Sequence, residues 1–235
     1  MTTFDDLIEQ ELKTFSGIVP VLELEGHVLL PDSMLTLRMT AAADCQLIAD
    51  AIQEDAFVAV SLKQAGVSSQ CEMQQDASID SVCLASIVAP YQLESGDYSI
   101  LLRGICRARS VVLQESDRIY RTALLELKPD FYADQPVIQR EHRQRELLEQ
   151  FSRMFLEHSA DPNYYHLLQR EIELGKLCDT LAGTINLEPA LCQLILAEHD
   201  VDLRSDLLLN FLKNKLREQQ THPFAHLTST AFSQN

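Results

Sequence analysis

In two stretches of the first half, 17–39 and 98–113, apolar and polar residues alternate, a pattern typical of half-buried strands, whereas the apolar run 57–63 is typical of a short buried strand. Between residues 17 and 39, leucines and β-branched residues alternate with polar ones, and Pro20, Gly26 and Pro31 interrupt the runs with turns. Ser95-Gly96-Asp97 is a hairpin signal between two later runs. Strands are therefore predicted within 18–39 and over 57–63, 81–93, 98–113 and 118–130.

Apolar residues at helical spacing predict helices at the start of the chain, between strands and throughout the second half. A short opening helix is expected around residues 4–12 and another helix over 41–56, whereas residues 64–80 are polar, aperiodic and predicted to form a loop. After Pro136 the pattern is purely helical. Four segments are expected there: one around 147–155 that ends before Pro162, one over 164–185, one that opens at Pro189, and one around 208–216.

Together these elements predict an α+β chain with two parts. Five to six short strands with one or two helices favour a small, strongly bent sheet or partial barrel over residues 1–130. A linker around 129–136 then leads into a helical bundle over 136–220. The polar residues 221–235 are expected to form a flexible tail.

The charge balance disfavours some classes of partner. Nineteen Lys and Arg residues against 35 Asp and Glu residues give a formal net charge of −16, which repels the phosphate backbone of nucleic acids. No run approaches the roughly 18 consecutive apolar residues of a membrane-spanning helix, and the acidic first residues resemble neither a signal nor a transit peptide. Six scattered cysteines without a Cys-x-x-Cys pair are expected to be reduced and mostly buried, which favours a cytoplasmic location.

The sequence contains no recognised catalytic or cofactor-binding motif. Gly175-Lys176 lacks both the first glycine and the hydroxyl residue of a phosphate-binding loop, and it lies in a helical context. His222 and His226 flank Pro223 in the tail, and no serine or cysteine stands in a nucleophile signature. We therefore expect no enzyme activity, no cofactor and no metal site.

Three stretches of the chain match the pattern of one protein family, and they occur in the same order along the chain. The first has Val-Pro-Val-Leu at 19–22 and Val-Leu-Leu-Pro at 28–31. The second, 83–113, has a small-residue strand, an acidic-glycine hairpin and a strand with matches at Leu101, Arg103, Gly104 and Arg107. The third, 177–212, has matches at Asp179, Ala182, Leu196, Asp200, Val201, Arg204, Leu208 and Leu212. In this succession the chain resembles the amino-terminal, substrate-binding domain of Lon protease over roughly residues 18–218.

The resemblance implies a PUA-like β pseudo-barrel followed by an all-α helical bundle. In the full protease this region helps to recognise and hold substrate polypeptides and contributes to assembly. Two elements depart from the family: Leu30-Pro31-Asp32 replaces the usual Phe-Pro-Gly, and residues 40–43 replace a Glu-Pro-Arg-Tyr element. The sequence contains neither a Walker loop nor a peptidase motif, so it resembles a stand-alone form that lacks the ATPase and peptidase modules.

The resemblance favours a non-catalytic, ATP-independent module that binds polypeptides or acts as an adaptor, with affinity from apolar grooves or exposed sheet edges. The expected partners are unfolded or extended polypeptides, with a cellular protease as a further candidate. Three alternatives remain open: an RNA-binding PUA-like domain, an accessory or assembly factor for a protease, and an enzyme with an unrecognised site.

The candidate interaction residues are Met39, Arg103 and Arg107. With Arg109, the two arginines form the compact basic cluster of the first half, and they surround Gly104, where we expect the strand to bend, bulge or approach another backbone. Strand alternation predicts that Ile105, Arg107 and Arg109 share one face. An isoleucine among the arginines favours structural, ion-paired arginines over an open cationic groove.

Overall fold

A computed structural model describes residues 12, 15–63, 81–114, 118–159, 172–185 and 187–221. In chain order the elements are β1 (Ile18–Leu24), β2 (Met34–Met39), α2 (Ala42–Gln53), β3 (Phe57–Leu62), β4 (Val82–Gln92), β5 (Tyr98–Gln114), β6 (Thr122–Lys128), α3 (Arg140–Ser159), α5 (Leu174–Thr184), α6 (Pro189–Ala197) and α7 (Val201–Thr221). Except for Leu12, the expected opening helix lies outside the described residues, as do the expected loop at 64–80 and the tail.

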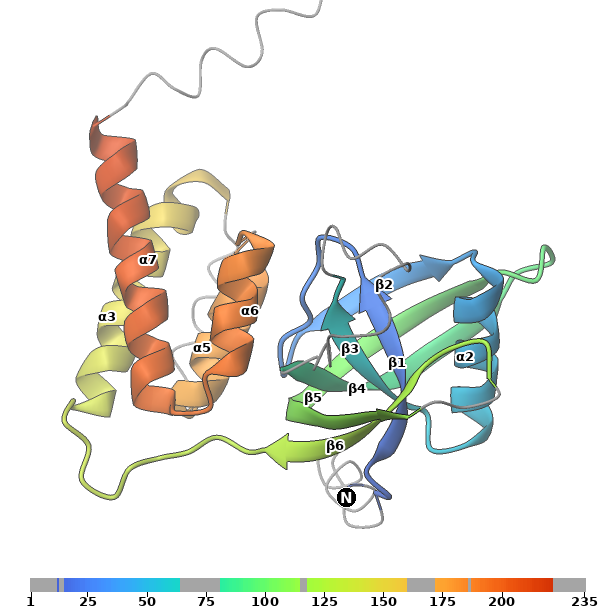
Figure 1. Cartoon of the computed structure of the whole chain (residues 1–235). Helices are drawn as coiled ribbons and strands as arrows, with labels where there is room; N and C mark the ends of the chain where they lie inside the picture. Colours follow the sequence, from blue (N-terminus) through green and yellow to red (C-terminus); the bar gives the residue numbers. More distant parts are fainter. Residues whose placement is uncertain are drawn as a thin grey trace, which may run out of the picture. The chain divides into compact units, whose positions relative to one another are not determined.

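The six strands form one sheet in the order β2-β5-β4-β3-β1-β6 (Figure 1). β1 and β3 run parallel, whereas the other pairs are antiparallel. The long strand β5 also pairs with β6, so β5, β4, β3, β1 and β6 form a closed ring of pairings. β2 extends the sheet beyond this ring, and among the described residues β5 is its sole partner strand.

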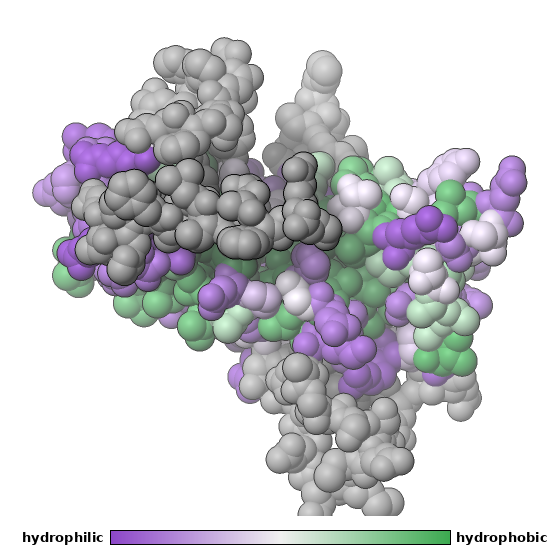
Figure 2. Space-filling view, turned by 90° about the horizontal axis from the view of Figure 1, so that it is seen from above, coloured by the Kyte–Doolittle hydropathy of each residue, from purple (hydrophilic) through white to green (hydrophobic). Residues whose placement is uncertain are grey.

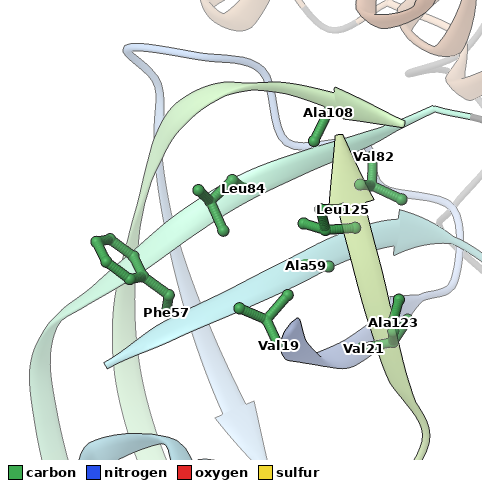
Figure 3. Close-up of a cluster of buried hydrophobic side chains, with 9 residues drawn as sticks. All are labelled: Val19, Val21, Phe57, Ala59, Val82, Leu84, Ala108, Ala123 and Leu125. Atoms are coloured by element: carbon green, nitrogen blue, oxygen red, sulfur yellow. The ribbon is translucent and has the colours of Figure 1, made fainter. Parts of the chain in front are cut away.

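A core cluster of buried apolar side chains lies between the five strands of the ring (Figure 3). Its members alternate along their strands with residues of the other face, as the period of two requires. They are Val19, Val21, Phe57, Ala59, Val82, Leu84, Ala108, Ala123 and Leu125. Phe15 packs edge-on against Phe57 with ring centroids 5.8 Å apart. Each large member contributes about 1.5–3 kcal/mol by leaving water.

Helix α2 packs beside β1 and β3 and buries Leu47, Ile48 and Ala51. Its last turn is connected to the segment between β5 and β6, because the Tyr120 hydroxyl donates to Asp50 Oδ2 at 2.6 Å. The Arg118 guanidinium in turn donates to the Tyr120 oxygen at 2.6 Å. These contacts fix α2 relative to the sheet.

Helices α3 and α7 run side by side (Figure 1). Arg140 forms an ion pair with Asp202 at 2.8 Å, and Lys213 forms one with Glu146 at 2.6 Å. Between the helices lie buried apolar side chains, which the periodicity of the sequence predicted: Leu147, Leu148, Phe151, Leu208 and Leu212. Among the helices that the structure describes, none is long and apolar enough to cross a membrane.

By their contacts the residues fall into two compact units, Met1–Phe131 with Asp179–His199, and Tyr132–Cys178 with Asp200–Asn235. The segment Asp179–His199, which holds the end of α5 and all of α6, thus groups with the strands. The domain limits expected from the sequence, 1–130 and 136–220, concern which segments fold independently. They stay a prediction.

Candidate functional site

The stretch around Gly104 is held against the turn that precedes β2. The Asp32 N–H donates to the Gly104 carbonyl at 3.0 Å, and the Gly104 N–H donates to the Ser33 carbonyl at 2.9 Å. A Cβ added at Gly104 would overlap the Leu30 carbonyl group, whose carbon would lie 2.9 Å away, and would lie 3.1 Å from Cys83 Sγ. The sequence prediction that another backbone approaches this glycine is therefore confirmed, and the backbone is that of Leu30.

The turn itself explains one departure from the family pattern. Pro31 holds the first central position, Asp32 has a φ of 59°, and the Ser33 N–H donates to the Leu30 carbonyl at 3.2 Å. This is the arrangement of a type II turn, in which a positive φ at the second central position favours glycine. Two residues, Asp32 and Ser33, face the single residue Gly104, which makes a bulge with its first residue in the left-handed region. Aspartate tolerates that region better than most residues do.

A second bulge, in β5, changes which of its residues share a face of the sheet. Leu84 pairs with Cys106 and Ala85 with Gly104, so Ile105 is the extra residue. Ile105 and Cys106 both pack against the core cluster. The prediction that Ile105 shares a face with Arg107 is therefore wrong, because alternation counted along the sequence does not include the extra residue of a bulge.

Arg107 is 3% exposed and forms two hydrogen bonds with Asp179, which is 2% exposed. Its Nη1 donates to Asp179 Oδ2 at 2.7 Å, and its Nη2 donates to Oδ1 of the same carboxylate. Nη1 also lies 3.3 Å from Asp130 Oδ1, and Nη2 donates to the Ile195 carbonyl at 3.4 Å. The side chain is thus a buried, ion-paired arginine, as the pattern of β5 favoured.

The charge state of Arg107 follows from these partners. Burial alone would lower its pKa, but the hydrogen bonds and negative charge of Asp179, with the charge of Asp130, raise the pKa above the ordinary value for arginine. The guanidinium is therefore permanently charged, and its bidentate geometry holds Asp179 in one orientation.

Other contacts hold the segment Asp179–His199 to the strands. The Gln193 side-chain amide donates to the Ser81 carbonyl at 2.8 Å, and the Phe131 N–H donates to the His199 carbonyl at 2.9 Å. A Cβ added at Gly183 would lie 3.1 Å from Ser33 Cβ, in the turn before β2. Arg107 and Asp179, which lie 72 positions apart in the sequence, are therefore the central pair of an attachment that the spacing of residues did not reveal.

The other two candidate residues differ from Arg107 in exposure. The Arg103 side chain is 17% exposed, and its Nη2 lies 4.0 Å from Asp32 Oδ1. Met39 is 5% exposed and ends β2, where its carbonyl accepts a weak hydrogen bond from Cys45 Sγ at 3.4 Å. Met39 thus lies in the interior. A role of Met39, Arg103 or Arg107 in binding stays a prediction.

An exposed face of the sheet extends across β2, the first part of β5 and the end of β4, and sequence reasoning did not identify it. The register aligns Thr36 with Leu101 and Leu101 with Ala89, and it aligns Arg38 and Tyr91 on either side of Ser99. Cross-strand neighbours share a face. We call the following residues the exposed sheet face: Met34, Thr36, Arg38, Ala89, Tyr91, Ser99, Leu101 and Arg103. Met34 and Tyr91 are 60% and 67% exposed.

The surface of the part of the molecule that carries the strands is mixed in character. Seen from above, it shows apolar residues among polar ones (Figure 2). The two basic members of the exposed sheet face each lie near a carboxylate: Arg38 forms an ion pair with Asp97 at 2.9 Å, and Arg103 Nη2 lies 4.0 Å from Asp32 Oδ1. Met34 and Tyr91 are the large, well-exposed apolar side chains of this face.

Two of the described cysteines are poor nucleophiles. Cys45, Cys83, Cys106, Cys178 and Cys192 form no disulfide bonds with one another. Burial raises the pKa of Cys106 to about 11 and that of Cys83 further, so both stay protonated at neutral pH and react slowly. Within the same residues, no three His, Cys, Asp or Glu side chains gather as a metal site would require.

Comparison with known proteins agrees with this architecture. Two solved structures share the fold: the N-terminal domain of the Mycobacterium avium complex Lon protease, with a TM-score of 0.68 at 17% identity, and a Lon N-terminal domain protein from Xanthomonas campestris, with a TM-score of 0.60 at 20% identity. The first comparison covers 84% of this chain and 98% of the other, and the second covers 83% and 98%. At such identities the likeness concerns the fold alone. Among curated proteins none matches the sequence.

The assignment to a protein family rests on the sequence. Residues 18–214 match the family model described as the ATP-dependent protease La (LON) substrate-binding domain. The match begins at the first residue of β1 and ends within α7, so it includes the whole sheet, the Arg107–Asp179 pair and the helices that follow. The chain therefore belongs to the Lon substrate-binding domain family.

Proposed function

We propose that this protein is a non-catalytic module that binds unfolded or extended polypeptides, either as a substrate-recognition unit or as an adaptor. The observation that carries the proposal is the match of residues 18–214 to the substrate-binding domain of Lon. The exposed sheet face supports it, because a polypeptide-binding surface needs accessible apolar side chains and backbone rather than a polar reaction centre. ATP independence, a protease partner and a cytoplasmic location are parts of this proposal that rest on the sequence.

We further propose that the strand part is a PUA-like pseudo-barrel and the part after residue 136 a helical bundle. The closed ring of pairings among β5, β4, β3, β1 and β6 supports the first. The packing of α3 against α7 supports the second. In this arrangement the sheet carries the binding surface, and the Arg107–Asp179 pair stabilises the attachment of the segment 179–199 to it.

The RNA-binding alternative has less support. It depends on Arg103 and Arg107, but acidic side chains lie beside both. Asp32 lies 4.0 Å from Arg103, while Asp179 and Asp130 surround Arg107. A phosphate would have to replace these carboxylates in a chain whose net charge is −16, against unfavourable long-range electrostatics.

The experiment that tests the proposal compares two forms of one model protein. A fluorescently labelled small protein is titrated with the full chain, once in its native disulfide-bonded form and once reduced, carboxymethylated and therefore unfolded. We expect the anisotropy to rise at micromolar concentrations for the unfolded form and to stay flat for the native form. Equal binding of both forms, or binding of neither, contradicts the proposed function.

A further inference from the structure

We propose that the polypeptide binds by adding an extended strand to the free edge of β2, and this inference rests on the proposed function. β2 pairs with β5 on one side, and among the described residues no strand pairs with its other side. An unpaired strand edge presents rows of N–H and C=O groups that another strand can use. Six residues of β2 span about 20 Å, enough for a partner segment of similar length.

The register shows which backbone groups are available. The Ser33 carbonyl accepts from the Gly104 N–H, and in an antiparallel pair bonded and non-bonded residues alternate. Leu35, Leu37 and Met39 are therefore bonded to β5. The N–H and C=O groups of Met34, Thr36 and Arg38 point away from β5, toward the free edge, while the side chains of the same three residues lie on the exposed sheet face.

The opposite edge of this part of the sheet is protected against strand addition, whereas among the described residues no proline or bulge lies within β2 itself. β3 pairs with β4 as far as Ser86, so the last residues of β4 have β5 as their one paired strand among the described residues. That edge carries Pro90, which has no N–H, and a register shift between Ile87 and Ala89. Prolines and bulges are the devices by which proteins prevent strand addition. β2, with the sequence MLTLRM, contains neither.

The side chains beside the β2 edge define the chemistry of the segment. On one face an added strand would contact Met34 and Thr36, and on the other it would contact Leu35 and Leu37, which are half-buried. Methionine adapts its shape to varied partners. An extended segment with apolar residues on both faces fits this edge, without a requirement for one sequence.

The charges around the edge add a preference for basic flanks. The turn before β2 (25–33) and the turn between β4 and β5 (93–97) carry Glu25, Asp32, Glu94 and Asp97, whereas β2 and the adjoining part of β5 carry Arg38 and Arg103; four negative and two positive charges give a local balance of −2. The chain as a whole carries −16. We therefore identify the occupant as an extended, largely apolar polypeptide segment flanked by lysine or arginine.

The test uses variants of the full chain that change the edge. Thr36→Pro removes an outward N–H at a position where an edge strand tolerates proline, and Thr36→Val keeps the N–H as its control. Met34→Lys puts a charge on the edge, and Val137→Lys, at a residue of the other unit that is 102% exposed, is the control of equal charge. Far-UV circular dichroism and thermal unfolding verify that each variant folds.

The probe is a short labelled peptide of alternating valine and leucine between lysines, which presents apolar side chains on both faces of an extended strand. We expect Thr36→Pro and Met34→Lys each to weaken binding by about tenfold or more, and both controls to stay within about twofold of the parent chain. The same peptide with every residue between the lysines N-methylated, so that neither edge keeps its donors, is expected to lose affinity by a similar factor.

The outcomes separate this inference from the proposed function. If the parent chain binds neither this peptide nor the unfolded model protein, the proposed function fails. If the parent binds and the edge variants bind equally well, strand addition at β2 is wrong while polypeptide binding stands. If Thr36→Pro instead converts a dimer into a monomer in sedimentation without changing peptide affinity, the β2 edge is the contact between two copies of this chain. That outcome overturns the inference.

Discussion

Replacement of Arg107 by methionine removes a charge from a buried ion pair of the strand unit. Arg107 and Asp179 are 3% and 2% exposed, and the guanidinium makes both its bonds to the carboxylate with its two terminal nitrogens. Loss of one partner leaves a buried carboxylate without its counter-charge, which typically costs about 3–5 kcal/mol. Because domains of this size have a free energy of unfolding of about 5–15 kcal/mol, we expect Arg107→Met to lower stability severely.

The double variant Arg107→Met with Asp179→Leu shows whether the lost stability comes from an unpaired charge or from lost packing. With both charges replaced by apolar groups of similar volume, we expect at least about 2 kcal/mol of the loss to be recovered, because the desolvation cost disappears with the charge. Urea unfolding followed by circular dichroism, with linear extrapolation, gives each free energy. A loss below about 1 kcal/mol for Arg107→Met, or a double variant as unstable as the sum of the two single variants, would refute the structural role of Arg107.

Three further predictions concern stability. Gly104→Ala should lower the free energy of unfolding by about 2–4 kcal/mol, because the new methyl overlaps the Leu30 carbonyl group and breaks two turn hydrogen bonds; an unchanged thermal midpoint would contradict the close approach. Asp32→Gly should raise the free energy by about 0.5–1 kcal/mol, because glycine adopts a φ of 59° without strain, whereas Asp32→Val should lower it. Tyr120→Phe should cost about 1 kcal/mol at neutral pH. The Tyr120 hydroxyl lowers the pKa of Asp50, so the charged hydrogen bond stabilises the fold fully above the unfolded-state pKa of about 4 and loses its effect as the pH falls through the lower folded-state pKa. The difference between Tyr120→Phe and the parent chain should therefore shrink below about pH 4 in pH-dependent unfolding; a constant difference would exclude this linkage.

Local patterns predicted local structure well. The short apolar run at residues 57–63 corresponds to the buried strand β3, the Ser95-Gly96-Asp97 signal to the β4–β5 turn, and Pro189 to the start of α6. Each of these depends on a few neighbouring residues: a run of apolar side chains, a glycine with φ of 89° at Gly96, and a proline that fits the first turn of a helix.

Features that depend on distant residues were not predictable in this way. The partner of Arg107 is 72 positions away, and no spacing rule selects Asp179 among 35 acidic residues. The bulge at Ile105 depends on how β4 meets β5. The free edge of β2 depends on the order of all six strands, so the sequence of β2 alone cannot distinguish an edge strand from a central one.

Hydrogen–deuterium exchange of the full chain, with and without saturating unfolded polypeptide, tests the central claim most directly. The claim that the strand unit binds extended polypeptides predicts slower exchange for amides of residues 34–39, because an added strand bonds the outward N–H groups of β2. Unchanged exchange throughout residues 15–63 and 81–114, under conditions in which the polypeptide is in large excess, would contradict it.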